Sequence, residues 1–386
     1  MKLLMTLSRI PYPLEKGDKL RAYHQIKAFL SQGISLTVVC FHFEKLQHDQ
    51  KNHLESLGGE WHFIQLDKWR VPFQFLRIIW TKLPLQVILF YNQRAHKRFK
   101  EILVNGQPDH LYAQLIRTAE YVKEETNFDK TLDYMDSFSA GLKRRAQHAP
   151  WYERWLYEWE YEKVKHYEHG VYHYFDHHTI ISKTDAENTG IPHFIDIVSN
   201  GIDASFIEAP VLAEYPNAVV FTGNMGYPPN VEAALRLGKK IMPLVWQHCP
   251  ETPLIIAGAE PHRTILSQLS DPRIHITGWL PDIKSAYQQG KVFVAPMTLG
   301  SGMQNKIIEA LAMGKSVICS PLVAKAFDAE VQLLLDIQMD DIQFAEAIIK
   351  HLSPDFSFDV QRSKQIVQKH FSWSKTSQQL LQLFQS

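Results

Sequence analysis

Short apolar runs alternate along the first half of the chain with stretches in which apolar residues recur every three or four positions. Between the first two runs, Leu20, Tyr23, Ile26 and Phe29 follow helical spacing, and Gly33 then ends the pattern. This alternation predicts β-α-β units. The expected strands are Leu3–Ser8, Ser35–His42, Trp61–Asp67, His110–Leu115, Thr131–Asp136 and Thr179–Ser182.

A second series of the same kind fills the rest of the chain, with expected strands at Ala218–Thr222, Leu254–Ala257, Ile274–Thr277, Val292–Pro296 and Val317–Ser320. Strands that alternate with helices form parallel sheets covered on both faces. We therefore expect an α/β fold of two Rossmann-like domains, residues 1–205 and 206–370, with a boundary near Asp203–Tyr215. A last helix within 371–386 is expected to pack back towards the first domain.

Composition and charge narrow the classes of function. The 386 residues contain 41 Lys+Arg and 41 Asp+Glu, so no net positive field attracts a polyanion, and nucleic acid is not expected as a partner. The three cysteines, Cys40, Cys249 and Cys319, are far apart in apolar surroundings, which is typical of reduced thiols. With neither a signal-peptide pattern nor a membrane span, we expect a cytoplasmic protein.

Two segments depart from the plain alternation. From Trp151 to His178, two stripes suit one long helix, Trp151, Trp155 and Trp159 and then His166, His169, His173 and His177. They could form an acceptor platform and a metal site, but a packed face and a solvated edge are preferred, because no carboxylate or cysteine pattern completes a metal set. The segment Trp69–Lys82 interleaves basic and apolar residues, which suits either contact with an anionic membrane surface or a core helix with snorkelling basic side chains.

The most informative stretch surrounds a glycine turn. A strand ends at Pro296, the turn Gly300-Ser301-Gly302 follows, and a helix is expected from Gln304 to Gly314. A helix N-terminus presents unpaired N–H groups, and glycines let a ligand approach the backbone, so this pattern indicates an anion site suited to a diphosphate. Lys306 adds a cation, and Glu309 lies on nearly the same face, where it can accept hydrogen bonds from ribose hydroxyls. The alternative is a tight turn in which Lys306 and Glu309 merely pair.

The run from Gly300 to Gly314 resembles the donor-binding motif of family 4 glycosyltransferases with the GT-B fold, and is most similar to the exosortase-associated sugar transferases. Further pieces of the chain follow the order of that family: Pro11-Tyr12-Pro13 with Gly17, Asp18 and Arg21, then Ile181–Glu187, Ser199–Asp203, Phe221–Met225, Gly278–Asp282 and Phe371-Ser372-Trp373. The resemblance covers nearly the whole chain.

This resemblance implies two Rossmann-like domains that face a central cleft, and transfer of a sugar from a UDP or GDP donor to a hydroxyl acceptor. The acceptor would be a glycan, a lipid-linked compound or a small molecule, transfer would retain the anomeric configuration, and the role would lie in cell-surface polysaccharide or glycoconjugate synthesis. No metal or other cofactor is expected, and contact with the inner membrane would be peripheral. The implied donor site comprises Gly17, Gly223, Asn224, Trp279, Leu280, Gly300, Ser301, Gly302, Met303, Lys306 and Glu309, with Lys306 and the diphosphate at its centre.

Three departures from the family pattern affect the expected chemistry. Ser301 stands where the family often has a Glu that contacts the sugar. No basic pair follows Gly223, which leaves Lys306 as the donor cation, with Arg9 or Lys16 as further candidates, and the Arg21 region is expected to help close the cleft. No His ends the strand Thr131–Asp136, so Asp136 becomes the polar catalytic candidate, or else the cap of the next helix. A non-enzymatic nucleotide-sugar sensor or partner subunit, and another GT-B enzyme such as an epimerase or phosphorylase, remain the alternatives.

Overall fold

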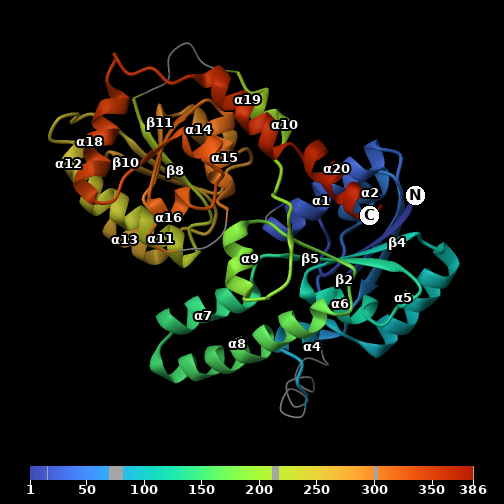
Figure 1. The fold of residues 1–386 in the computed structure, drawn as a ribbon. Helices are drawn as coiled ribbons and strands as arrows, with labels where there is room; N and C mark the ends of the chain where they lie inside the picture. The colour runs from blue at the N-terminus through green and yellow to red at the C-terminus, as the bar shows by residue number, and fades with distance from the viewer. Residues whose placement is uncertain (15, 69–80, 211–216, 300–302, 386) are drawn as a thin grey trace. The chain divides into compact units, whose positions relative to one another are not determined.

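The chain forms two compact units, Met1–Gly201 with Trp373–Ser386, and Ile202–Ser372. The computed structural model describes residues 1–14, 16–68, 81–210, 217–299 and 303–385 (Figure 1). Most of the segment Trp69–Lys82 and the turn Gly300–Gly302 therefore lie outside the described residues. We call Met1–Gly201 with Trp373–Ser386 the N-unit and Ile202–Ser372 the C-unit.

The N-unit is built on a parallel sheet with the strand order β3-β2-β1-β4-β5-β6-β7. Alternate side chains of the central strand point to opposite faces: Leu3, Met5 and Leu7 enter one core cluster and Leu4 enters another. Both faces are thus covered by helices, as the unbroken apolar runs predict. The strands are β1 (Lys2–Leu7), β2 (Ser35–His42), β3 (Glu60–Gln65), β4 (His110–Gln114), β5 (Asp129–Met135), β6 (His177–Ile180) and β7 (Asp196–Ile197).

Helices from both ends of the chain cover one face of this sheet. In α1 (Gly17–Ser31), Ile26 and Phe29 share a cluster with Leu380 and Phe384 at the C-terminus, and α1 contacts α20 (Trp373–Leu383) (Figure 1). The other described helices of the N-unit are α2 (His48–Ser56), α4 (Leu85–Phe90), α5 (Gln93–Gly106), α6 (Ile116–Val122), α7 (Phe138–His148), α8 (Trp151–Tyr172) and α9 (Lys183–Thr189). The C-terminal helix therefore completes the core of the N-unit.

The C-unit has a second parallel sheet, with the order β10-β9-β8-β11-β12-β13, and one continuous hydrophobic core. Its strands are β8 (Val219–Thr222), β9 (Leu254–Ala257), β10 (Ile274–Gly278), β11 (Val292–Ala295), β12 (Ser316–Cys319) and β13 (Leu335–Ile337). Its described helices are α10 (Ala204–Ile207), α11 (Pro228–Arg236), the π-helical turn η2 (Leu237–Ile241), α12 (Met242–Val245), α13 (Arg263–Gln268), α14 (Lys284–Gln288), α15 (Asn305–Ala312), α16 (Pro321–Ala324), α17 (Ala329–Gln332), α18 (Asp341–Leu352) and α19 (Val360–Phe371).

The expected α/β class is confirmed, and the expected strands coincide with observed ones to within a residue or two at their ends. The sequence patterns missed β7 and β13, which are the last strands at one edge of each sheet. These strands contain only 2 and 3 residues, too few for any periodicity to show.

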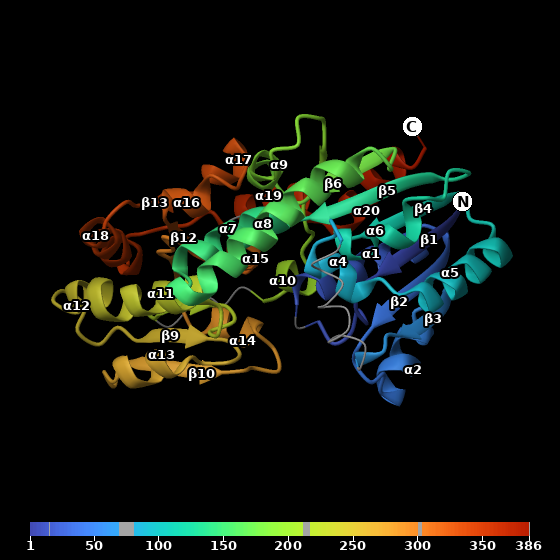
Figure 2. The same cartoon turned by 90° about the horizontal axis from the view of Figure 1, so that it is seen from below.

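The aromatic helix α8 differs from its expectation. Trp151 is 86% exposed, Trp155 64% and Trp159 37%, so the Trp stripe is not a packed face. The helix packs instead through Val164, Tyr167 and Val171, and runs beside α7 in both views (Figures 1 and 2). It ends at Tyr172, which leaves His173 as its C-cap and His177 in β6, so the His stripe does not lie on one helix.

Candidate functional site

The candidate site lies at the carboxyl edge of the C-unit sheet, where the strand order reverses. The chain runs from β8 outwards to β9 and β10, and then returns to the other side of β8 to form β11. In open parallel sheets, ligands bind beyond the carboxyl ends of the strands at such a switch point. Gly223 follows β8 directly and Met297 follows β11, and both lie beside the side chain of Lys306 on α15.

Lys306 is held by a polar and aromatic environment. Its Nζ atom donates to Oδ1 of Asn230 at 2.5 Å and lies 4.6 Å from the ring centre of Phe221. The side chain is buried, and no carboxylate of the described residues lies within ion-pair distance of it. Burial lowers its pKa to about 7, against the opposing effect of the Glu309 charge. The amine is therefore placed to gain charge when an anion binds.

Gly223 makes this close arrangement sterically feasible. A Cβ atom at this position would lie 2.6 Å from Nδ2 of Asn230 and 3.0 Å from Nζ of Lys306, and its φ of +151° is one that other residues rarely adopt. The following residue, Asn224, is exposed, and its backbone oxygen accepts a hydrogen bond from Nδ2 of Asn230 at 2.8 Å. The side-chain amide of Asn230 thus forms hydrogen bonds both with the loop after β8 and with the amine of Lys306.

Glu309 and Lys306 have separate partners. Oε2 of Glu309 accepts a hydrogen bond of 2.7 Å from the hydroxyl of Tyr287, which is 2.8 Å from Oγ1 of Thr222. Burial raises the pKa of Glu309, while the Tyr287 hydrogen bond and Lys306 oppose that shift. No ion pair joins the two side chains in the described structure, so the alternative of a simple Lys306–Glu309 pair is wrong.

The remaining C-unit candidates follow the same sheet edge. Trp279 and Leu280 come directly after β10, with Trp279 67% exposed and Leu280 packed against the core. Met303 also packs partly against the core, and α15 begins after the N-cap Gln304, as expected. Gly300, Ser301 and Gly302 lie outside the described residues.

The N-unit candidates Asp136 and Gly17 lie at the carboxyl edge of their own sheet. Asp136 follows β5 and has an exposed side chain. It does not cap the next helix, because the N-cap of α7 is Ser137, whose hydroxyl accepts from the backbone N–H of Ala140. Gly17 begins α1, and a Cβ atom there would meet nothing within 4 Å, so the fold itself does not require glycine.

Two of the basic candidates in the N-unit are already paired. Arg21 is fully buried: its Nε donates to Oδ2 of Asp133 at 2.7 Å and its Nη1 to Oδ1 of Asn200 at 2.9 Å. It joins α1 to β5, so its guanidinium is fully engaged inside the N-unit. Arg9 forms a 2.6 Å ion pair with Asp18.

Sequence reasoning missed Asn230 and Tyr287, whose positions depend on tertiary structure. Asn230 lies in the first turn of α11 and Tyr287 on α14, each in a segment without a recognisable motif. A weak signal was present for Asn230, since Pro228-Pro229 marks a helix start close behind Gly223.

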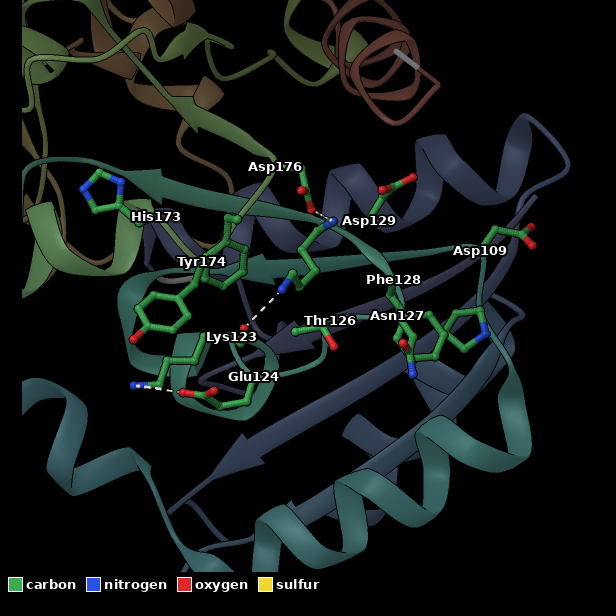
Figure 3. A pocket seen from close by; sticks show the side chains of 13 residues that line it. Asp109, Lys123, Glu124, Thr126, Asn127, Phe128, Asp129, His173, Tyr174 and Asp176 are labelled. Atoms are coloured by element: carbon green, nitrogen blue, oxygen red, sulfur yellow. Dashed lines mark hydrogen bonds and ion pairs between the residues drawn. The ribbon is translucent and has the colours of Figure 1, made fainter.

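A pocket of about 720 Å³ lies elsewhere in the N-unit (Figure 3). Asp109, Asp129 and Asp176 border it at the amino ends of β4, β5 and β6, the edge opposite to the one where ligands bind parallel sheets. Its lysines have partners: Nζ of Lys130 donates to the backbone oxygen of Lys123, and Lys123 pairs with nearby carboxylates. We assign no function to this pocket.

The described residues show neither a metal-binding cluster nor a membrane-spanning helix. Across the described ranges, no group of three or more His, Cys, Asp or Glu side chains is arranged to hold a metal ion. Among the described helices, none combines the length and apolar character needed to cross a bilayer.

Comparison with known proteins identifies a family match in the C-unit and several relatives. Residues 216–353 match the family model described as Glycosyl transferases group 1, which covers the switch point in the C-unit. An uncharacterized 44.6 kDa protein in the cps region of Klebsiella pneumoniae is 22% identical over 100% of this chain and 98% of its own length. A phosphatidyl-myo-inositol mannosyltransferase of Mycobacterium tuberculosis is 27% identical over 49% of this chain and 53% of its own.

Solved structures share the fold at low sequence identity. A glycosyltransferase from Rickettsia africae superposes with a TM-score of 0.70 at 11% identity, covering 99% of this chain and 97% of that one. Anabaena Alr3699/HepE, solved in complex with UDP, has a TM-score of 0.67 at 13% identity and covers all of both chains. The chain has a glycosyl transferases group 1 domain at residues 216–353 and two α/β units, each with a parallel sheet, in a fold of the GT-B type. This chain is a glycosyltransferase.

Proposed function

We propose that the enzyme transfers a sugar from a nucleotide-diphosphate donor to a hydroxyl acceptor, and that the C-unit holds the donor diphosphate at the switch point between β8 and β11. One observation carries the proposal: Lys306 is a buried amine beside Gly223, supported by Asn230 and free of a carboxylate ion pair among the described residues. An anion is the ligand that such a group favours.

The proposed chemistry depends on charge that develops during the reaction. As the bond between the sugar and the phosphate breaks, negative charge builds on the departing diphosphate, and Lys306 stabilises it more strongly in the transition state than in the ground state. Glu309, oriented by Tyr287, would accept hydrogen bonds from the ribose. Trp279 and Leu280 would lie near the base, Gly17 would approach the donor, and Asp136 would serve the acceptor side. The turn Gly300–Gly302 would supply backbone N–H groups to the phosphates.

Relatives support the choice of substrates. One lies in a cps region, another is a phosphatidyl-myo-inositol mannosyltransferase, and a structural neighbour binds UDP. We therefore favour a UDP or GDP sugar as donor, without a metal, and a glycan or lipid-linked acceptor in polysaccharide or glycolipid synthesis. Retention of the anomeric configuration and a cytoplasmic location at the inner membrane surface belong to the same proposal.

The donor can be identified by thermal stabilisation. A ligand that binds only the folded state raises the melting temperature. At a ligand concentration a hundredfold above Kd, it adds about 2.7 kcal/mol to the free energy of unfolding. UDP, GDP, ADP and inorganic phosphate would be compared on the full chain. We expect one nucleoside diphosphate to stabilise the protein well above phosphate; no response to any nucleotide would contradict the donor site.

The role of Lys306 can be tested by Lys306→Ala. Loss of one electrostatic contact to a developing charge should reduce turnover by roughly a hundredfold or more. The matched control is Lys325→Ala, because the Lys325 side chain is exposed on the same unit and forms no hydrogen bond or ion pair with described residues. Near-normal turnover in Lys306→Ala, with an unchanged melting curve, would refute the role.

A further inference from the structure

The N-unit has a switch point of its own. The chain runs from β1 outwards to β2 and β3, and then returns to the other side of β1 to form β4. Arg9 lies two residues beyond the end of β1, and Arg117 three residues beyond the end of β4. By the rule that places ligands at the carboxyl ends of parallel strands, these arginines flank the position where a ligand of the N-unit would bind.

Arg117, on α6, is held in place by side chains of two other helices. Its Nε and Nη2 atoms donate to Oε1 of Gln86 on α4 at 3.0 and 2.7 Å. The guanidinium carbon lies 5.1 Å from the ring centres of both Phe90 on α4 and Phe138 on α7, while Arg117 itself belongs to α6. Contacts of this kind restrict the side chain to one orientation before any ligand arrives.

The charge of Arg117 is not neutralised by a direct partner. Its hydrogen bonds go to a neutral amide, and no carboxylate of the described residues forms an ion pair with it. Burial and the nearby Arg9 lower its pKa to about 10, which Asp18 and Asp136 oppose and Arg145 reinforces. Because Arg9 already occupies Asp18, the described charges leave a part-buried guanidinium fork without an anion.

We propose that Arg117, assisted by Arg9, binds a phosphate group of the acceptor. The proposal rests on the function proposed above and specifies its acceptor as a phosphorylated compound. A guanidinium held by Gln86 and by two aromatic rings can still donate to phosphate oxygens from Nη1, which forms no hydrogen bond with the described residues. The phosphate could belong to a lipid-linked sugar or to a soluble sugar phosphate, since both present the same group.

A binding experiment tests the anion site directly. Inorganic pyrophosphate is titrated into the full chain by calorimetry, and into Arg117→Gln, Lys306→Met and the double variant. We expect two sites in the unmodified protein, one in each single variant and none in the double variant. Arg98→Gln, which alters an exposed arginine of the same unit, should keep both sites.

The two proposals fail separately in this experiment. If Arg117→Gln keeps both pyrophosphate sites, the acceptor inference is overturned whatever Lys306→Met does. If Lys306→Met keeps both, the donor site is wrong while the Arg117 result still stands. Should Arg117→Gln unfold, Arg117→Lys preserves the charge without the fork, and we expect it to bind pyrophosphate more weakly than the unmodified protein; unchanged affinity would count against the inference.

Kinetics distinguishes recognition from a structural role. With a polyprenyl diphosphate-linked sugar and a soluble sugar 1-phosphate as separate acceptors, Arg117→Gln should raise acceptor KM about tenfold or more, as expected for lost hydrogen bonds to a charged group. Hydrolysis of the donor alone should not change. The acceptor with the larger kcat/KM shows whether the bound phosphate belongs to a lipid-linked sugar or to a soluble sugar phosphate. An equal rise in KM for an unphosphorylated sugar acceptor, or equal loss of donor hydrolysis, would overturn the inference.

Discussion

Lys306 connects the burial of one residue to a measurable property of the enzyme. Its amine has a pKa of about 7 because burial disfavours the charged form. A bound diphosphate favours that form, so binding should take up protons between about pH 7 and the higher pKa that Lys306 has in the complex. We expect the affinity for the nucleoside diphosphate to fall by roughly tenfold or more between about pH 7 and pH 9. Calorimetry in buffers of different ionisation enthalpy measures the proton uptake.

The control for proton uptake is Lys306→Met, which should bind weakly and without this pH dependence. The charged form of Lys306 favours ligand binding but disfavours folding of the ligand-free protein. Because the folded-state pKa of Lys306 lies below the unfolded value, charging it disfavours folding, fully below about pH 7 and not at all above the usual lysine range. Lys306→Met should therefore raise the melting temperature of the ligand-free protein at neutral pH. A lower melting temperature, or proton uptake that persists in the variant, would contradict this account.

At the scale of elements, two glycines at strand-to-helix connections should behave differently. Gly223→Ala forces a Cβ atom against Asn230 and Lys306, at a φ that alanine disfavours, so we expect turnover to fall by roughly tenfold or more as the lysine is displaced. Gly17→Ala meets open space at the start of α1, so stability should change by less than about 0.5 kcal/mol.

Donor kinetics completes this comparison. If the donor approaches Gly17 as proposed, Gly17→Ala should raise donor KM while its urea unfolding curve matches that of the unmodified chain. Unchanged KM would remove Gly17 from the site, and unchanged turnover in Gly223→Ala would show that the loop after β8 can move without consequence for Lys306.

Prediction from the sequence succeeded where a strand is an apolar run buried on both faces. Central strands such as β2 and β9 appear as unbroken apolar runs because both of their faces are covered. The edge strand β13 is too short to show a period. The Trp stripe of α8 was misread because spacing along a helix identifies a shared face, but not whether anything packs on it.

At the scale of the molecule, the last residues of the chain stabilise the unit built by the first. Phe384 is buried against the N-unit, its ring stacked on His110 at 4.3 Å and close to Tyr112 at 5.7 Å. We expect Phe384→Ala to destabilise the N-unit by about 3 kcal/mol, as for other buried aromatic truncations. Hydrogen exchange should accelerate in α1 and β1 and remain unchanged in the C-unit.

The control for Phe384 is Val104→Ala, because Val104 is 70% exposed on the same unit and should cost less than about 0.5 kcal/mol. Faster exchange confined to the C-unit in Phe384→Ala would contradict this prediction, because the terminal helix would then stabilise the C-unit instead of the N-unit.

The sequence by itself determined the fold class, the positions of the central strands and the candidate pair of Lys306 and Glu309, because periodicity and a strand-turn-helix motif are local properties. Only the tertiary structure decided which groups surround that pair. Asn230 and Tyr287 lie 76 and 22 residues from their partners Lys306 and Glu309, and Gln86 lies 31 residues from Arg117. Such contacts arise when separate strands end at one sheet edge, and burial there shifts the pKa of each group away from its ordinary value.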